Sequence, residues 1–363
     1  KVGGVHVTCF APFPATQLIA ALKNVKALTV VERMDNPLAQ SNPLVQGIRA
    51  AFADAFTGLS YGSFGEFKYP AITGIPKIYA CVAGLGSRDV RGCHFNSILK
   101  NMLSAKPMEF SCVGVKHKLE LPGAEDPDLR PSGAFSMRGH SVGGFGSVTT
   151  NKLIASFVGE LFNLHVQAYP KYGSEKKGLP TTYYLTVADA HIRTHSELEH
   201  VEFIPLNDVN AFNLGNPLAG IAANGSIFIQ SDKLDPLDVW NAIPAYGQKI
   251  IRNKKLKVFY LDTVKIARQI ATDPDLQQRM QGVCLVGIFI KVTPFAGRSG
   301  MGDEQVLASV EKYIRKYFGK RGEKVVQENI TCVRHGLTDV MEIPAEVIGG
   351  VKEVAAGELV AAK

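Results

Sequence analysis

A glycine-rich segment in the middle of the chain carries the residues most suited to chemistry. Gly143, Gly144 and Gly146 directly precede a run with helical spacing, and the first turn of that run contains Ser147. Glycines let a ligand approach the backbone closely, and the free amides and positive dipole at a helix start attract phosphate. We therefore expect a loop that holds a phosphorylated ligand.

The glycine loop does not follow the motifs of two common nucleotide sites. G-x-G-x-x-G needs a third glycine where Thr149 stands, and the next strand should end in an acid, whereas it ends in Gln167-Ala168-Tyr169. Lys152 follows the glycines without the spacing of a P-loop. NAD binding and a turn that serves packing alone stay as alternatives, and another phosphorylated ligand or a partner's cofactor is favoured.

A second loop strengthens this interpretation. It follows the next expected strand, so in a parallel sheet it emerges at the same carboxyl edge as the glycine loop. Adjacent lysines and a hydroxyl beside a glycine-rich helix start suit a polyanion, although an exposed basic turn is the simpler alternative. The residues of this loop that we expect at the site are Tyr172, Ser174, Lys176, Lys177 and Gly178.

The elements that must position these loops alternate between strands and helices along the first region, which predicts a mainly parallel α/β sheet covered on both faces. Apolar residues recur at helical spacing in three stretches, and short β-rich runs lie between them. The expected strands are Gly4–Phe10, Ala27–Glu32, Lys77–Ala83 and Glu109–Val115, and the expected helices are Thr16–Leu22, Pro43–Phe56 and Phe95–Met102.

A proline-rich stretch separates two expected domains. Residues 121–133 contain three prolines and two glycines, which is typical of a linker. It divides a domain at 1–120, whose first part we expect upstream or on another polypeptide, from a second α/β domain at 134–346 and a loosely held tail at 347–363. In the second domain we expect strands at Leu164–Ala168, Tyr183–Val187, Val201–Pro205, Ser226–Gln230 and Lys257–Leu261, and helices after the glycine loop, at Thr263–Thr272 and at Glu304–Phe318.

Composition and cysteine spacing exclude several function classes. The chain is 46% hydrophobic and 20% charged, as in ordinary soluble proteins, and its longest apolar run is too short to span a bilayer. The net charge is +7, but no nucleic-acid signature accompanies it. The six cysteines form no C-x-x-C pair, so we expect free thiols in a reducing, cytoplasmic compartment and neither a metal site nor an iron–sulfur cluster.

Four segments, in order, resemble the 2-oxoacid:ferredoxin oxidoreductases of the pyruvate type. The first region resembles the transketolase-C-terminal-like domain of that family. The positions that carry this likeness are Phe13, Glu32, Arg33, Pro37, Ala39, Pro43, Leu44 and Gly84 to Asp89.

The second region resembles the family's Rossmann-like gamma domain. Gly143, Gly146, Asn151 and Lys152 match the glycine motif at the start of that domain. The lysine loop from Tyr172 to Gly178 and the closing segment from Tyr313 to Leu337 also match in type. Phe145 stands where the family has aspartate, and Leu179-Pro180 replaces a glycine and its neighbour, so ligand contacts are expected to differ in detail.

The resemblance implies an enzyme that decarboxylates a 2-oxoacid, pyruvate being favoured, transfers the acyl group to coenzyme A, and passes electrons to ferredoxin. Thiamine diphosphate, Mg²⁺ and [4Fe–4S] clusters would lie on other domains or subunits of a dimeric assembly. This segment would contribute assembly contacts and coenzyme A binding, without being active alone. No catalytic residue stands out, because His140, His165, His191, His195 and His200 are scattered. The alternatives are a non-catalytic scaffold subunit and an NAD-binding oxidoreductase.

Overall fold

A computed structural model describes residues 1–59, 68–171, 178–208, 210–295, 297 and 300–350. The chain divides into two compact units, Lys1–Leu129 and Arg130–Lys363. This boundary falls within the stretch that the sequence marks as a linker. Each unit has its own sheet.

The first unit is built on a parallel sheet in the order β1-β2-β3. Its strands are β1 (Ala27–Glu32), β2 (Lys77–Ala83) and β3 (Phe110–Val113), and its helices are α1 (Ala15–Leu22), α2 (Pro43–Thr57) and α3 (Gly92–Met102). Pro43 opens α2 at a position where a missing amide costs nothing, and Gly58 ends it with φ +72°. Between these ends, α2 buries Val45, Ile48 and Phe52 against α1 and the sheet.

The expected strand at Gly4–Phe10 is wrong. No strand forms over these residues, and most of their side chains are exposed. The alternating pattern suits a strand, but a strand also needs a partner with which to pair its backbone, and the described part of this unit provides none. The other three expected strands of this unit are confirmed as β1, β2 and β3.

The second unit contains a seven-stranded mixed sheet in the order β10-β9-β8-β7-β4-β6-β5. Five strands (β4, β5, β7, β8 and β9) point the same way, because β6 and β10 are antiparallel to their neighbours and the other pairings are parallel. An α/β fold with mainly parallel sheets is thus confirmed. The strands are β4 (Phe135–Val142), β5 (His165–Lys171), β6 (Pro180–Ala188), β7 (Val201–Leu206), β8 (Ile221–Gln230), β9 (Lys257–Leu261) and β10 (Met341–Glu342).

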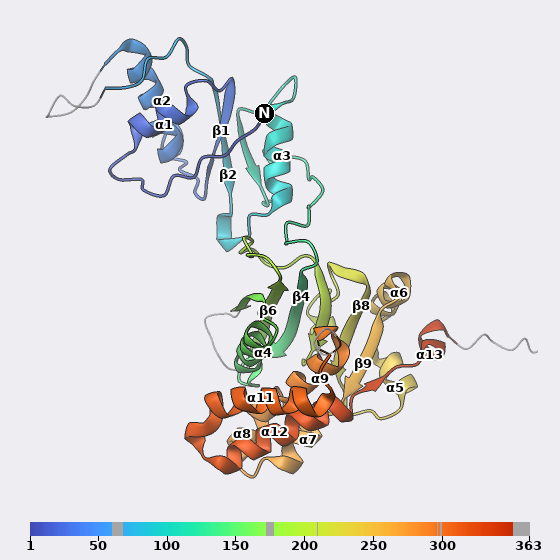
Figure 1. Ribbon diagram of the computed structural model, residues 1–363. Helices are drawn as coiled ribbons and strands as arrows, with labels where there is room; N and C mark the ends of the chain where they lie inside the picture. Colours follow the sequence, from blue (N-terminus) through green and yellow to red (C-terminus); the bar gives the residue numbers. More distant parts are fainter. Residues whose placement is uncertain (60–67, 172–177, 209, 296, 298–299, 351–363) are drawn as a thin grey trace, which may run out of the picture. The chain divides into compact units, whose positions relative to one another are not determined.

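Helices cover both faces of this sheet, as Figure 1 shows. On one face Phe203 and Phe228 pack with α4, α9, α11 and α12, and on the other Ile204 and Ile227 pack with α5 and α6. Alternate residues of each strand thus serve opposite layers. The helices are α4 (Ser147–Leu161), α5 (Pro236–Ala242), α6 (Ala245–Lys254), α7 (Thr263–Ile270), α8 (Pro274–Met280), α9 (Cys284–Val292), α11 (Asp303–Phe318), α12 (Glu323–Thr338) and α13 (Ala345–Gly349).

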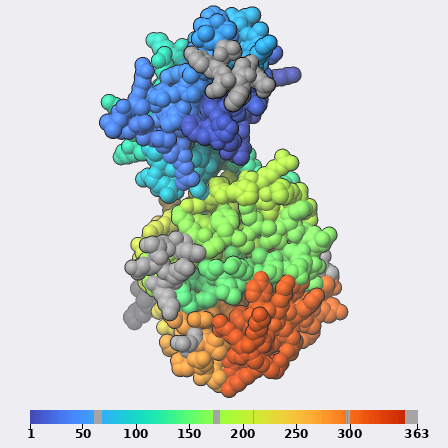
Figure 2. All heavy atoms as spheres, turned by 90° about the vertical axis from the view of Figure 1, so that its left-hand side faces the viewer, coloured from blue at the N-terminus to red at the C-terminus, as the bar shows by residue number. Residues whose placement is uncertain are grey.

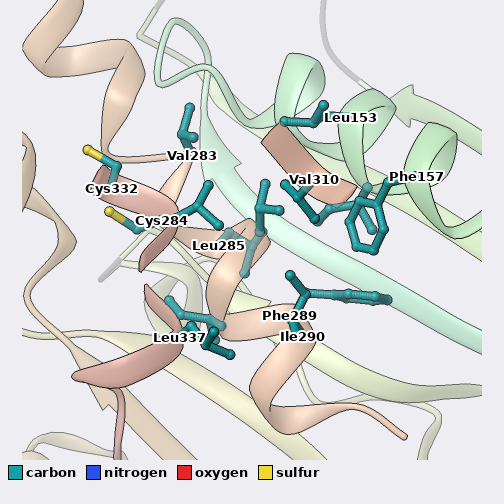
Figure 3. Packing of buried hydrophobic residues seen from close by; sticks show 14 of the residues in the cluster. Leu153, Phe157, Val283, Cys284, Leu285, Phe289, Ile290, Val310, Cys332 and Leu337 are labelled. Carbon is teal, nitrogen blue, oxygen red and sulfur yellow. The ribbon is translucent and has the colours of Figure 1, made fainter. Parts of the chain in front are cut away.

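The larger core is centred on α9, whose side chains are labelled in Figure 3. Leu285 and Phe289 are completely buried, and burial of a side chain of this size stabilises the fold by roughly 1.5–3 kcal/mol. Glycines let α9 and α12 pack backbone to backbone: a Cβ on Gly287 would lie 2.0 Å from the carbonyl oxygen of Val333. Within the described residues, no helix is long and apolar enough to cross a membrane.

Candidate functional site

The glycine loop and the start of β6 are joined by backbone hydrogen bonds at the carboxyl edge of β4. The amide of Gly143 donates to the carbonyl oxygen of Leu179 at 2.8 Å, and the amide of Gly178 donates to the carbonyl oxygen of Gly143 at 3.0 Å. β5 runs parallel to β4 but is separated from it by β6. Gly143 begins the glycine loop and Gly178 ends the lysine loop. These two ends therefore lie at the same edge of the sheet, as the sequence predicts.

Four of the predicted site residues lie outside the described residues: Tyr172, Ser174, Lys176 and Lys177. The residues on either side of them are described. Lys171 ends β5 in an ion pair with Glu197, and Gly178 is held to the glycine loop. The contacts of the two lysines stay a prediction.

Gly146 is the residue before the first turn of α4, and close packing explains why it must be glycine. Its φ is +79°, and a Cβ would lie 2.4 Å from the carbonyl oxygen of Arg279. Gly282, in the turn after α8, is close to the glycine loop in the same way: a Cβ on Gly282 would lie 2.6 Å from the carbonyl oxygen of Phe145. The glycine loop is therefore fixed against the turn between α8 and α9 through two backbone approaches that no side chain allows.

The beginning of α4 offers backbone donors. The first amides of any α-helix have no acceptor within the helix, and in the described part of the chain no side chain caps α4. Gly144 has φ +102° and open space around its Cβ position. Together these features leave amide groups available to an anion, in the field of a 15-residue helix.

Three predicted residues on α4 do not all face the same way. Ser147 is buried and its Oγ bonds to the Oγ of Ser141 on β4. Asn151 is also buried, and its Nδ2 donates to the carbonyl oxygen of Tyr184 on β6 at 2.9 Å. Lys152 is exposed. Ser147 and Asn151 thus attach α4 to the sheet and position the glycine loop, while Lys152 leaves a cation at the surface.

Sequence reasoning missed two polar residues at the same edge. Asn207 and Asp208 follow β7 and are both buried. The backbone amide of Asn207 donates to the carbonyl oxygen of His140 at 2.8 Å. Its side-chain Oδ1 accepts from the hydroxyl of Tyr183 at 2.7 Å. The signal was present in the sequence, because a polar pair directly after an expected parallel strand belongs at the carboxyl edge.

The polar groups beneath this edge are kept uncharged or are tightly held. Burial, followed by the charge of Arg138, lowers the pKa of His140 to about 4, against a smaller opposing effect of a hydrogen bond to the backbone of Pro217. Burial raises the pKa of Tyr183 far above its ordinary value. Arg138 donates to the carbonyl oxygens of Leu198 and Pro217 at 2.9 and 3.0 Å. Arg138 thus joins β4 to the segments that precede β7 and β8.

The groups that this edge presents are of the kinds that bind anions. In the described part of the chain, no three histidine, cysteine or acidic side chains gather as a metal site would require. The edge offers backbone amides and the exposed Lys152 to a ligand. We therefore interpret it as an anion-binding edge.

The topology favours a ligand at this edge but not a dinucleotide site of the NAD type. The chain leaves β4 towards β5 and β6 on one side, and from β7 it continues towards β8 and β9 on the other. Ligands of open α/β sheets bind where the strand order reverses in this way. In the NAD-type unit, however, the strand after the helix lies directly beside the first strand, whereas here β6 stands between β4 and β5.

Comparison with known proteins matches both units. The chain is 26% identical to the pyruvate-flavodoxin oxidoreductase of Trichormus variabilis over 94% of its length and 27% of that protein. It is 25% identical to the pyruvate:ferredoxin oxidoreductase of Moorella thermoacetica over 98% of its length and 28% of that protein. The chain thus spans little more than a quarter of the curated relatives it matches.

A family model matches the second unit, and a solved structure aligns with part of the chain. A pyruvate oxidoreductase subunit from Thermotoga maritima aligns over 58% of this chain and 98% of its own, at 20% identity and a TM-score of 0.42. Residues 136–338 match the family model described as pyruvate ferredoxin/flavodoxin oxidoreductase. This match covers most of the second unit, including the glycine loop, α4 and α12. The chain belongs to the pyruvate ferredoxin/flavodoxin oxidoreductase family.

Proposed function

We propose that this chain is the coenzyme A-binding segment of a 2-oxoacid:ferredoxin oxidoreductase, with pyruvate as the favoured substrate. The complete enzyme would decarboxylate the 2-oxoacid, as the family resemblance implies, and would pass electrons to ferredoxin or flavodoxin, the acceptors in the names of its relatives. Other domains or subunits would carry thiamine diphosphate, Mg²⁺ and iron–sulfur clusters. The first unit would serve assembly of a cytoplasmic complex.

One observation carries the proposal: the hydrogen bond from Gly178 to Gly143 brings the end of the lysine loop to the start of the glycine loop. Uncapped amides at the start of α4 would donate hydrogen bonds to phosphate oxygens, and Lys176 and Lys177 would pair with other phosphate oxygens. Coenzyme A has several phosphates, and its thiol accepts the acyl group when it is bound. The residues at this edge fit a polyanion of that kind.

The test is the double substitution K176A/K177A in the complete enzyme. Loss of two cationic contacts to phosphate should raise the KM for coenzyme A by roughly tenfold or more, at about 1.5–3 kcal/mol for each hydrogen bond to a charged group. The KM for the 2-oxoacid should change little. A matched control is K249A/K257A, which removes two exposed lysines from α6 and the amino end of β9.

A scaffold role gives a different result. If the lysine loop contacts only protein, K176A/K177A leaves the KM for coenzyme A unchanged and instead weakens the complex, which native mass measurement detects. An unchanged KM in an intact complex would overturn the proposed role of the two lysines.

A further inference from the structure

A second feature beside the glycine loop is a small hollow on the other side of Gly146. It has a volume of about 140 Å³ and is enclosed by the start of α4, by α8, and by the facing parts of α11 and α12. On this side of the molecule the orange-red surface of α11 and α12 borders the green surface of the segment with α4 (Figure 2). A hydrogen bond of 2.9 Å between Ser156 and Tyr317 joins α4 to α11 next to it.

The walls of the hollow are apolar. Met280 and Val283 are almost completely buried, and Leu276 and Phe318 are half-buried around the opening. A hollow of this size holds one ring system, since sites for drug-sized molecules measure about 300–1,000 Å³. A ligand larger than one ring system would therefore keep part of its structure outside.

Asn329 on α12 provides a polar group within these walls. It is 1% exposed and lines the hollow. Its Nδ2 donates to the carbonyl oxygen of Val325 at 2.6 Å, whereas its Oδ1 has no hydrogen-bond partner among the described residues. Buried amide oxygens are almost always paired. Oδ1 of Asn329 is thus an acceptor to which a ligand in the hollow can donate a hydrogen bond.

Two arginines lie at the opening. Arg279 and Arg321 line the hollow, are exposed, and have no recorded ion pair within the described residues. The nearby arginines on α11 and α12 differ, because Arg315 pairs with Glu311 and Glu323, and Arg334 with Glu304. Among the described residues, the positive charge of these two arginines is therefore uncompensated where an anionic group outside the hollow would lie, next to the positive end of α4.

We propose that this hollow binds the aminopurine base of a phosphorylated nucleoside. The amino group donates to Oδ1 of Asn329, the ring packs against the apolar walls, and the phosphate pairs with Arg279 and Arg321. Such a group is found in a free adenine nucleotide and in the nucleotide end of coenzyme A. None of the lysine-loop residues lines this hollow, so nucleotide binding here is tested separately from the proposed function of that loop.

Calorimetric titration of the full chain with AMP tests this proposal, with adenosine and IMP as matched probes. AMP should bind at least tenfold more tightly than adenosine, which lacks the phosphate, or IMP, which carries a carbonyl in place of the amino group. N329L should abolish the preference for AMP over IMP, and R279A/R321A should abolish the preference for AMP over adenosine. R268A, which removes an exposed arginine from α7, is the control.

Circular dichroism of each variant separates loss of binding from loss of folding. Displacement of AMP by coenzyme A would identify the nucleotide end of that molecule as the occupant, and independent binding of the two would identify a free nucleotide. The proposal is overturned if AMP does not bind to the folded wild-type chain, or if it binds equally well to folded N329L and R279A/R321A.

Discussion

Gly178 and Gly143 lie 35 residues apart in the sequence, with α4 and β5 between them, yet the amide of Gly178 donates to the carbonyl oxygen of Gly143 at 3.0 Å. This bond, with its counterpart from Gly143 to Leu179, ties the end of the lysine loop to the start of the glycine loop. The two segments that the sequence singles out are therefore mechanically coupled. A change in the backbone conformation of one loop should therefore shift the backbone of the other.

Substitution of Gly178 by alanine should test this coupling. Gly178 has φ +76° with open space around its Cβ position, so alanine brings conformational strain of about 1–2 kcal/mol but no clash. We expect the KM for coenzyme A of the complete enzyme to rise several-fold. G58A is the control, because Gly58 has φ +72° and equally open space at the end of α2. If both variants have the same KM, the coupling has no part in ligand binding.

Two glycines of the loop should differ sharply in their tolerance of alanine. At Gly146 a Cβ would lie 2.4 Å from the carbonyl oxygen of Arg279, whereas at Gly144 nothing lies within 4 Å. Both have positive φ, so G144A should lose only about 1–2 kcal/mol of unfolding free energy, and G146A should lose that and the cost of separating two packed backbones. Urea denaturation of the full chain measures the difference. Equal midpoints would contradict the packing described for Gly146.

The sequence predicts some elements to the residue. The expected strands Ala27–Glu32, Lys77–Ala83 and Lys257–Leu261 coincide with β1, β2 and β9. In each case a short β-rich run carries enough apolar side chains to show a strand without reference to its neighbours. Local pattern and tertiary environment agree there, so sequence reasoning succeeds.

The central strand β4 is not predicted, for a reason that its neighbours explain. Ser136, Arg138 and Ser141 are polar yet buried. Arg138 is satisfied by carbonyl oxygens of Leu198 and Pro217, which lie 60 and 79 residues away in the sequence. Such long-range partners leave no trace in local hydropathy. The same limitation hides Asn329, whose place in the hollow depends on four separate helices.

Stability should fall in acid because of His140. Burial holds the pKa of His140 at about 4, below its ordinary 6.5, so between these values the unfolded chain binds a proton that the folded chain does not. The stabilising contribution of the neutral imidazole is fully present above pH 6.5 and is lost as the pH falls to about 4, for a total of about 3 kcal/mol. H140Q should reduce this loss when unfolding free energies are compared at pH 7 and pH 4.5. An unchanged pH dependence in H140Q would contradict this account.

Thiol reactivity should separate Cys9 from the other five cysteines. Cys9 is exposed, while Cys81, Cys93, Cys112, Cys284 and Cys332 are buried. The adjacent thiol of Cys332, together with burial, raises the pKa of Cys284 well above its ordinary value, and Figure 3 shows the two sulfur atoms next to each other. Since the thiolate is the reactive form, an aromatic disulfide reagent at pH 8 should modify one thiol per folded chain rapidly and all six after denaturation. C9S should abolish the rapid phase. A rapid phase that persists in folded C9S would show that one of the five other thiols is accessible.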